Sequence, residues 1–383
     1  MTYENSPEFQ NCWIELSKSA LSNNIGAFRR LLAPEQQLLC VVKSNAYGHG
    51  MVPIAREALA AGASWLAVFS VEEGAMLRDA GITAPILALG PSFGSQYLLA
   101  VKYQLRVTVA SIDGIKDYTS SLTTERIPVH LKLETGTNRQ GILYSELDDV
   151  SSLILSRGIP VEGAYTHYAD IEDTTDHTFA SGQRDQFEKS LNRLRALGVQ
   201  VALPHTACTA AAILFPNTYF GMVRVGIGTY GLWPSKETNV SAQNLGRAHL
   251  ALQPVMNWKT RIAQIKTVPR GEYVGYGRTF RATRDTRIAV LPVGYADGYW
   301  RAFSNAANTL VHGMRARVVG RVCMNLMMID VTDIPDVATG DVVTLLGTDG
   351  DDAVTAEQLA ACAGTINYEI VTCAAPNAPR RLV

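Results

Sequence analysis

The sequence predicts a parallel (β/α)8 TIM-like barrel followed by a mostly β C-terminal domain. Through the first 244 residues, short apolar runs alternate with segments of helical periodicity at a fairly even spacing, as expected for about eight β-α units. From about Leu245, short or period-2 apolar runs separated by Gly and Asp turns replace this pattern. We therefore expect a barrel over residues 11–244 and a β domain over residues 245–383.

The barrel is favoured over an open doubly wound sheet by where the chemically versatile side chains fall. They lie shortly after predicted strands or within the last one, and all strand ends of a barrel face one mouth. An open sheet remains an alternative. The residues concerned are Lys43, Arg139, His167, Thr209 and Arg224.

The individual elements follow from periodicity. A helix carrying Leu21, Ile25, Phe28 and Leu32 is capped by Ser17 or Ser19, and further helices are expected at 53–61, 71–80 and 183–197. Strands of the first part are expected at 13–16, 38–42, 65–69, 86–89, 106–110, 129–133, 161–166, 199–203 and 223–227. Those of the second part are expected at 255–268, 288–293, 315–322, 327–331 and 342–346, with residues 355–362 as its one helix.

Composition narrows the class of protein. The 383 residues are 47% apolar and carry a formal net charge of −1, so there is no electrostatic argument for nucleic acid or an anionic membrane. No apolar run approaches the roughly 20 residues of a membrane span, and the start lacks a secretory signal. Six scattered cysteines without a C-x-x-C pair fit a reducing cytoplasm. We expect a cytoplasmic enzyme without a metal site.

Lys43 is the first candidate catalytic residue. It follows the apolar run 38–42 and precedes the loop-forming residues 44–50. Partial burial at the end of a strand lowers the pKa of an amine and makes it a nucleophile toward an aldehyde. Most lysines after a strand are simply solvated, so the position alone makes Lys43 only a candidate for a Schiff base.

Several strings, taken in order, resemble the alanine racemases, pyridoxal phosphate enzymes with a barrel and a β domain. The resemblance covers essentially the whole chain. A looser form of the lysine motif occurs in other barrel-type pyridoxal enzymes, whereas the strings around Tyr276 and Tyr295 are specific to racemases. The strings are WIELSKSALSNNI (13–25), VVKSNAYGHG (41–50), KLETGTNRQG (132–141), EGAYTHYA (162–169), VRVGIGTYGLWPS (223–235), GEYVGYGRTF (271–280), LPVGYADGYWR (291–301), GRVCMN (320–325) and INYE (366–369).

The resemblance implies racemisation by two bases, because the α-proton leaves one face of the substrate and another returns to the opposite face. It assigns Lys43 to one face and Tyr276 to the other. Tyrosine has an ordinary pKa near 10 and needs cationic neighbours to act near neutral pH. The family pattern places Arg224 at the pyridine nitrogen of the cofactor, where an arginine keeps its proton and leaves that ring a weaker electron sink.

The resemblance also implies the remaining site. His167 stacks on the cofactor, Arg139 contacts its phenolate oxygen, and Met324 offers its backbone N–H to the substrate carboxylate. Tyr276, Tyr295 and Met324 come from the other subunit of a head-to-tail homodimer, and Tyr295 with Tyr368 narrows the entrance. The phosphate-holding residues are Tyr47, Thr209, Gly226, Ile227 and Tyr368. The implied role is D-alanine supply for peptidoglycan.

Several positions depart from the commonest family pattern. Thr137 and Asn138 stand in place of Met and Gly, Glu134 in place of Asp, Asn325 in place of Asp, and Cys208 with Thr209 in place of Asn and Ser. Many family members carbamylate the lysine at the position of Lys132, and here an ordinary charge pair with Glu134 is the alternative.

Other functions stay open. A small pocket rejects an added hydroxyl only weakly, so a serine or broad-specificity racemase is the alternative, although Tyr368 favours alanine. Arg224 disfavours a pyridoxal decarboxylase, which keeps an acid at the ring nitrogen. The long β domain disfavours a non-catalytic pyridoxal phosphate carrier. Taken singly, Tyr276, His167 and Arg224 would each have a structural interpretation, as would Tyr47, His49 and His205.

Overall fold

The computed structural model of the chain describes residues 10–123, 125–247 and 250–383. Its contacts divide these residues into two compact units. The barrel unit lies within residues 19–46 and 51–253, and the β unit within residues 10–18, 47–50 and 254–383. This division differs from the expected ranges 11–244 and 245–383, because the first strand and the segment after Lys43 make their contacts with the C-terminal part.

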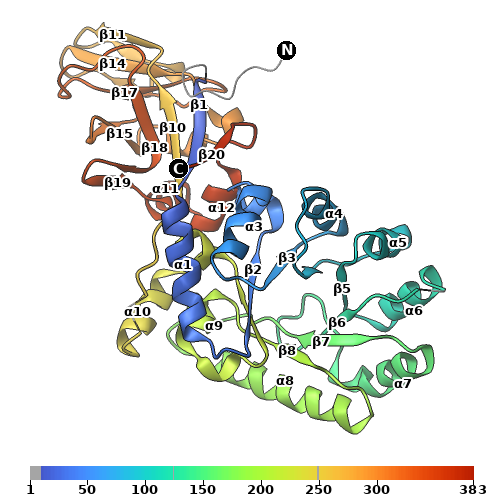
Figure 1. Ribbon diagram of the computed structural model, residues 1–383. Helices are drawn as coiled ribbons and strands as arrows, with labels where there is room; N and C mark the ends of the chain where they lie inside the picture. Colours follow the sequence, from blue (N-terminus) through green and yellow to red (C-terminus); the bar gives the residue numbers. More distant parts are fainter. Residues whose placement is uncertain (1–9, 124, 248–249) are drawn as a thin grey trace. The chain divides into compact units, whose positions relative to one another are not determined.

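A parallel sheet of eight strands forms the barrel unit, in the order β8-β7-β6-β5-β4-β3-β2-β9 (Figure 1). The end strands approach closure through the Gly221 N–H, which donates to the carbonyl of Pro204 at 2.9 Å. The predicted (β/α)8 barrel is thereby confirmed. The strands are β2 (Gln37–Val41), β3 (Trp65–Val68), β4 (Ile86–Ala88), β5 (Arg106–Val109), β6 (Val129–Lys132), β7 (Val161–Tyr165), β8 (Leu203–His205) and β9 (Met222–Val225).

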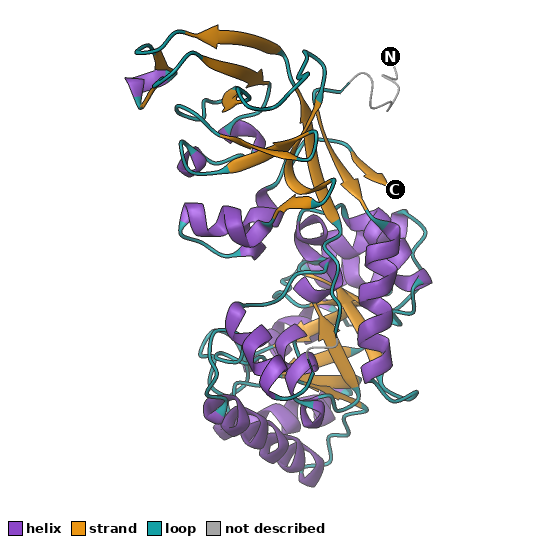
Figure 2. Cartoon of the chain, turned by 90° about the vertical axis from the view of Figure 1, so that its left-hand side faces the viewer, coloured by secondary structure: helices purple, strands orange, loops and turns teal. Residues whose placement is uncertain are grey.

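Helices surround these strands (Figure 2). Local sequence sets their ends: Ser70 accepts from the Glu73 N–H in a capping box that starts α4, and Gly158 ends α7 in the left-handed conformation. The helices are α1 (Lys18–Leu31), α3 (Met51–Ala60), α4 (Val71–Asp79), α5 (Ser95–Lys102), α6 (Ile112–Ser121), α7 (Leu147–Arg157), α8 (Thr178–Ala196), α9 (Thr209–Leu214) and α10 (Lys236–Asn244), with short 3₁₀ turns η2 (Tyr144–Glu146), η3 (Pro216–Thr218) and η4 (Ile227–Tyr230). Within the described ranges, no helix is long and apolar enough to span a membrane.

One barrel strand lies later in the chain than predicted. The apolar residues 199–203 indicated a strand, but β8 covers Leu203–His205. Val199 instead completes the end of α8, where its N–H donates to the carbonyl of Leu194 at 3.0 Å. The shift matters for the site, because it makes His205 the last residue of a barrel strand, paired with Tyr165.

The β unit contains two sheets and a hairpin. The larger sheet has the order β16-β15-β18-β10-β1-β20 with β19 on β18, the smaller sheet has the order β11-β14-β17, and β12 pairs with β13. The strands are β1 (Cys12–Leu16), β10 (Met256–Arg261), β11 (Gln264–Val268), β12 (Tyr273–Val274), β13 (Phe280–Arg281), β14 (Thr286–Leu291), β15 (Asn308–Val311), β16 (Met314–Arg317), β17 (Met327–Asp330), β18 (Val342–Asp349), β19 (Asp352–Val354) and β20 (Arg380–Leu382); the 3₁₀ turns are η5 (Tyr276–Arg278), η6 (Tyr295–Asp297) and η7 (Arg301–Phe303).

Three expectations for this part of the chain were wrong. The first strand, β1, pairs with β10 and β20 and is not a barrel strand. The apolar stretch 255–268 is two strands, because β10 and β11 join different sheets. The predicted helix is observed as α11 (Ala356–Ala363), but a second helix, α12 (Asn367–Cys373), follows it and carries Tyr368.

Gly48 offers a test of how the segment after Lys43 packs in the β unit. Its φ is +83°, and a Cβ there would lie 2.1 Å from the carbonyl oxygen of Val371. We expect Gly48→Ala to lower the free energy of unfolding by about 3 kcal/mol or more. Gly340 has a similar φ of +94° and open space around it, so Gly340→Ala should cost only about 1 kcal/mol. Equal losses in urea titrations would contradict the predicted overlap with Val371.

Candidate active site

Lys43 begins an unusual turn at the end of β2. Ser44, Asn45 and Ala46 have φ values of 54°, 52° and 55°, so the chain makes a left-handed turn without glycine. Side chains fix it from both ends: the Ser44 N–H donates to Glu73 Oε1 at 2.7 Å, and Asn45 Oδ1 accepts from the Met51 N–H at 2.9 Å. The strained backbone therefore holds Lys43 in one place at the mouth of the barrel.

The surroundings of Lys43 lower its pKa. Burial is the main cause and the positive charge of Arg139 adds to it, while Glu73 opposes both. Lys132, the last residue of β6, has its pKa lowered to about 8 for the same reasons, by burial first and then by Arg139 and Arg224. Two amines that lose their protons more readily than usual therefore both feel the charge of Arg139.

His167 lies two residues after β7 and is neutral near pH 7. Burial lowers the pKa of its ring to about 3, helped by the positive charges of Arg224, Arg139, Lys132 and Lys43. The ring of His167 therefore lies within electrostatic reach of four cationic side chains of the barrel unit. Three of them, Lys43, Arg139 and Arg224, are residues that the sequence singled out together with His167.

Arg224, on β9, is buried and held by hydrogen bonds to neutral partners. Nη1 donates to His205 Nδ1 at 2.7 Å and to the His205 carbonyl at 3.1 Å. Nη2 donates to the carbonyls of Thr166 at 2.8 Å and Thr206 at 3.0 Å. Four of the five guanidinium N–H groups are used in this way, so among the residues that the structure describes the Nε–H is the donor left for a ligand.

Thr209, the first residue of α9, lies against the start of η4. Its Oγ1 accepts from the Gly226 N–H at 3.1 Å and from the Gly228 N–H at 3.4 Å. A Cβ at Gly228 would lie 2.6 Å from Cγ2 of Thr209, so glycine permits this close approach. Thr209, Gly226 and Gly228 therefore lie together at one corner of the barrel unit.

The site residues of the β unit form two further groups. Tyr47 and Tyr368 pair, with ring centroids 6.2 Å apart. Tyr295 and Met324 lie on adjacent segments, because the Tyr295 N–H donates to the carbonyl of Cys323 at 3.0 Å. Tyr295 is 43% exposed and Met324 57% exposed in the single chain.

Tyr276 begins the turn η5 between β12 and β13. Below the turn, β-unit residues pack into a core of Val268, Val274, Ala282, Ile288 and Val319. Gly275 and Gly277 take φ values of 73° and 70°, which lets the chain reverse tightly around Tyr276. The tyrosine is 73% exposed, so a rigid turn presents its ring to the surroundings.

The charge of the barrel site fits an anionic cofactor. Lys43, Lys132, Arg139 and Arg224 converge on His167, and the partners of Arg224 are neutral. The carboxylates that oppose the lowered pKa values are Glu73 at Lys43 and Glu134 at Lys132. A ligand with a phosphate and a phenolate would compensate this excess of positive charge. Pyridoxal phosphate has both groups, together with an aldehyde for the amine of Lys43.

Comparison with known proteins agrees with this geometry. Residues 16–234 match the family described as alanine racemase, N-terminal domain, and residues 255–382 match alanine racemase, C-terminal domain. The chain is 38% identical over 375 residues to an alanine racemase of Leptospira interrogans, covering 97% of this chain and 95% of that protein. It is 40% identical over 372 residues to one of Desulforamulus reducens, covering 96% and 98%.

Solved structures agree as well. A crystal structure of alanine racemase from Bacillus anthracis with bound L-Ala-P matches with a TM-score of 0.91 and 34% identity, covering 99% of this chain and 96% of that one. One from Streptomyces lavendulae matches with a TM-score of 0.89 and 32% identity, covering 98% and 97%.

The chain belongs to the alanine racemase family. Its members are pyridoxal phosphate-dependent isomerases.

The departures from the common racemase pattern have structural explanations. Asn138, which replaces glycine, has a φ of 53°, a left-handed conformation that asparagine tolerates better than most residues. Thr137, which replaces methionine, donates from its hydroxyl to the carbonyl of His167 at 2.5 Å. Thr209, which replaces serine, keeps its hydroxyl at Gly226. For Asn325 the structure offers no comparable explanation.

Glu134 is engaged with backbone groups. Its Oε1 accepts from the Gly136 N–H at 2.6 Å. Burial alone would raise the pKa of Glu134, but hydrogen bonds from backbone N–H groups of residues 135–138 outweigh it and lower the pKa. The carboxylate therefore stabilises the loop that leads to Arg139. Its negative charge also partly opposes the lowering of the Lys132 pKa.

The lowered pKa of Lys132 predicts a pH-dependent stability in this racemase. Between the folded pKa of about 8 and the ordinary 10.5, the unfolded chain binds more protons, so Lys132 destabilises the fold below pH 8 and this cost disappears as the pH rises to 10.5. We expect Lys132→Met to be more stable than the wild type by roughly 2 kcal/mol at pH 7, with the difference vanishing by pH 10.5. Urea unfolding at several pH values measures it.

The control is Lys116→Met, because the side chain of Lys116 is 63% exposed. That variant should follow the wild type at every pH. A difference between Lys132→Met and the wild type that stays constant from pH 7 to 10.5 would show that Lys132 does not titrate as a free amine, as a carbamylated side chain would not.

Sequence reasoning missed part of the racemase site. It left His205 with a structural interpretation, and it did not single out His130, Glu162 or Tyr165. One signal was available: His130 and Lys132 are two residues apart on a strand, so they share a face. His205 could not be recognised as a strand residue in this way, because the strand was predicted at 199–203 and β8 covers Leu203–His205.

Proposed function

We propose that Lys43 and Tyr276 are the two acid–base groups with which this enzyme interconverts L-alanine and D-alanine. The observation that carries the proposal is the amine of Lys43, held on a strained turn with a lowered pKa at the point where the barrel's cationic side chains meet. An amine that is free of its proton can attack an aldehyde and can later accept a proton from carbon.

The cofactor would be held mainly by the barrel unit. When bound, pyridoxal phosphate supplies a carbonyl carbon for an amine and withdraws electrons from the carbon whose proton is exchanged. Arg224 would direct its remaining Nε–H to the pyridine nitrogen, and the neutral ring of His167 would stack on the cofactor. The full proposed set is Lys43, Tyr47, Arg139, His167, Thr209, Arg224, Gly226, Ile227 and Tyr368.

The substrate would be held by Arg139, Met324 and Tyr295. Arg139 provides positive charge for the substrate carboxylate, and the backbone N–H of Met324 provides a directed donor. Tyr295 with Tyr368 would restrict the entrance to small side chains such as the methyl group of alanine. This selection supports alanine over larger amino acids.

A head-to-tail homodimer is part of the proposal. Tyr276, Tyr295 and Met324 are exposed in the single chain at 73%, 43% and 57%, which suits side chains that complete a site on a second copy. Large apolar groups on a surface often mark such contacts. We further propose that the enzyme works in the cytoplasm and supplies D-alanine for peptidoglycan.

The function is tested by supplying the purified chain with pyridoxal phosphate and L-alanine and following D-alanine by a D-amino-acid oxidase assay. Formation of D-alanine, with the reverse conversion starting from D-alanine, supports the proposal. Release of carbon dioxide, or tight cofactor binding without either conversion, would contradict it.

A further inference from the structure

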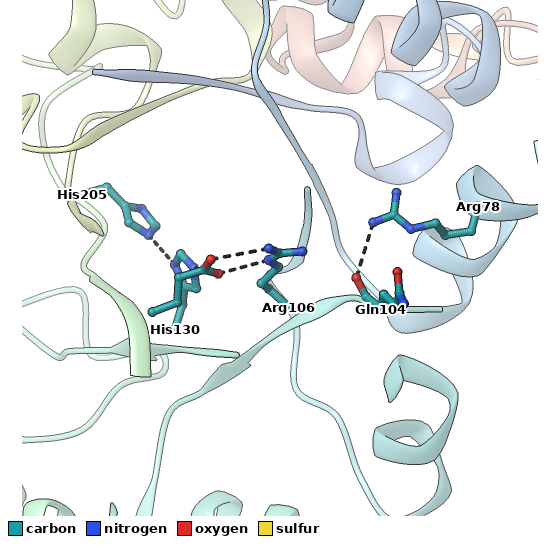
Figure 3. Close-up of polar contacts among 6 residues, drawn as sticks. Arg78, Gln104, Arg106, His130 and His205 are labelled. Carbon is teal, nitrogen blue, oxygen red and sulfur yellow. Dashed lines mark hydrogen bonds and ion pairs between the residues drawn. The ribbon is translucent and has the colours of Figure 1, made fainter. Parts of the chain in front are cut away.

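A hydrogen-bonded chain of side chains runs from the buried Arg224, His205 and His130 to the partly exposed Glu162 and Arg106. His205 Nδ1 accepts from Arg224 Nη1 at 2.7 Å, and His205 Nε2 lies 2.9 Å from His130 Nδ1. His130 Nε2 lies 3.4 Å from Glu162 Oε2, which also pairs with Arg106 Nε at 3.1 Å. Figure 3 shows His205, His130 and Arg106 lying in a row. The chain thus links the active-site guanidinium to a carboxylate near the start of β7.

The positions of the protons follow from the two ends of this chain. Arg224 can only donate, so His205 Nδ1 must carry a lone pair and His205 Nε2 must carry the proton. His130 Nδ1 must then accept, which leaves the proton of His130 on Nε2. Glu162 is an acceptor in its carboxylate form, so it receives that proton. Every bond runs in one direction, from Arg224 to Glu162, and both imidazoles are neutral.

The charge states agree with this arrangement. Burial lowers the pKa of His205 well below its ordinary value, and the charge of Arg224 adds to it. Burial also lowers the pKa of His130, although Glu162 opposes this. Burial alone would raise the pKa of Glu162, but its contacts with His130 and Arg106 outweigh burial and lower the pKa.

The surrounding packing holds the imidazole rings of His130 and His205 in place. His130 and His205 are fully buried, and the ring of Tyr165 stacks on His205 with centroids 4.9 Å apart. A Cβ at Gly163 would lie 2.3 Å from His130 Nδ1, so only glycine leaves room for that ring. Arg224 also lies over the Tyr165 ring, with its guanidinium carbon 5.1 Å from the ring centroid.

We propose that Glu162 is a positioning residue for Arg224, acting through His130 and His205, whose protons it directs to Nε2. If Glu162 were not an acceptor, the Nε2–H of His130 would be buried without a partner, which favours the opposite tautomer in both rings. His205 would then present an N–H to Arg224, and two donors would face each other. Glu162 therefore preserves the bond from Arg224 Nη1 to His205 Nδ1, one of the four hydrogen bonds that orient the guanidinium. This inference rests on the proposed role of Arg224.

The test compares Glu162→Gln with Glu162→Met in the cofactor-loaded enzyme. Both variants lose the charge and the ion pair with Arg106, but only glutamine keeps an oxygen that accepts from His130. We expect Glu162→Gln to keep kcat within about threefold of the wild type and Glu162→Met to lose roughly tenfold in kcat with little change in KM. Urea unfolding should show similar destabilisation for both, so that stability does not explain the difference.

A second readout is independent of activity. Long-range 1H–15N correlation spectra distinguish Nδ1–H, Nε2–H and doubly protonated rings, and the chain has seven histidines to assign. The wild type and Glu162→Gln should show His130 and His205 as neutral Nε2–H rings, and Glu162→Met should show mixed or reversed tautomers. Identical spectra and rates for the two variants, or a charged His205 in the wild type, would overturn the proposal. A wild type with the expected spectra but no racemisation would support the proton arrangement and overturn the proposed function.

Discussion

Replacing Lys43 by methionine is expected to lower the rate of alanine racemisation by at least about 10⁴-fold in both directions. Methionine approximates the length of the side chain but has no amine, so the variant lacks the group that we propose as the nucleophile for the cofactor's carbonyl and as one of the two bases. The neighbouring charges that lower the pKa of Lys43 remain in place. The measurement is D-alanine formation from L-alanine, together with the absorbance spectrum of the purified protein before and after borohydride.

The control for this prediction is Lys236→Met, because Lys236 is an exposed residue at the start of α10. It should keep wild-type activity and the wild-type response to borohydride. If peptide mapping of the reduced wild type found the cofactor on any lysine other than Lys43, the assignment of the site would be wrong.

Replacing Tyr276 by phenylalanine is expected to lower kcat by about 10³-fold while cofactor binding is retained. The phenol hydroxyl is the only group removed, and the core beneath the turn, including Val268 and Ile288, is untouched. One face of the substrate then lacks a proton carrier, so neither direction of the reaction can be completed efficiently. Measuring kcat in both directions and the cofactor absorbance separates this outcome from loss of the cofactor.

Tyr273→Phe is the matched control for Tyr276. Tyr273 lies three residues earlier on β12, is 46% exposed, and packs between Arg278 and Arg281. We expect little change in kcat for this variant. A Tyr276→Phe enzyme that kept more than about a tenth of the wild-type rate would exclude the phenol as an essential base.

Much of the fold could be predicted because a (β/α)8 barrel produces a regular alternation of apolar strands and amphipathic helices in the sequence. The apolar runs alternating with helical segments predicted a parallel barrel, and the observed order places each β-α unit beside the next. β1 could not be placed in this way, because its partners β10 and β20 are distant in the chain. Local pattern shows that a segment is a strand, but it does not show which sheet the strand joins.

The candidate site was predictable to the extent that its residues follow strands. Lys43, Arg139 and His167 could be singled out by position, and the charges of Lys43 and Arg139 both lower the pKa of His167. The network behind Arg224 was not predictable, because the sequence around a buried histidine such as His130 does not show whether its ring only packs in the core, binds a ligand or links other polar groups by hydrogen bonds. Only the distances to His205 and Glu162 reveal the direction of its hydrogen bonds.

If the two bases of one site come from two subunits, mixing Lys43→Met and Tyr276→Phe chains, each inactive alone, should restore activity. After dissociation and random reassociation, half of the dimers are hybrids, and one of their two sites combines an intact Lys43 with an intact Tyr276. We expect recovery of about a quarter of the wild-type activity. No recovery, in a mixture shown to contain hybrid dimers, would contradict it.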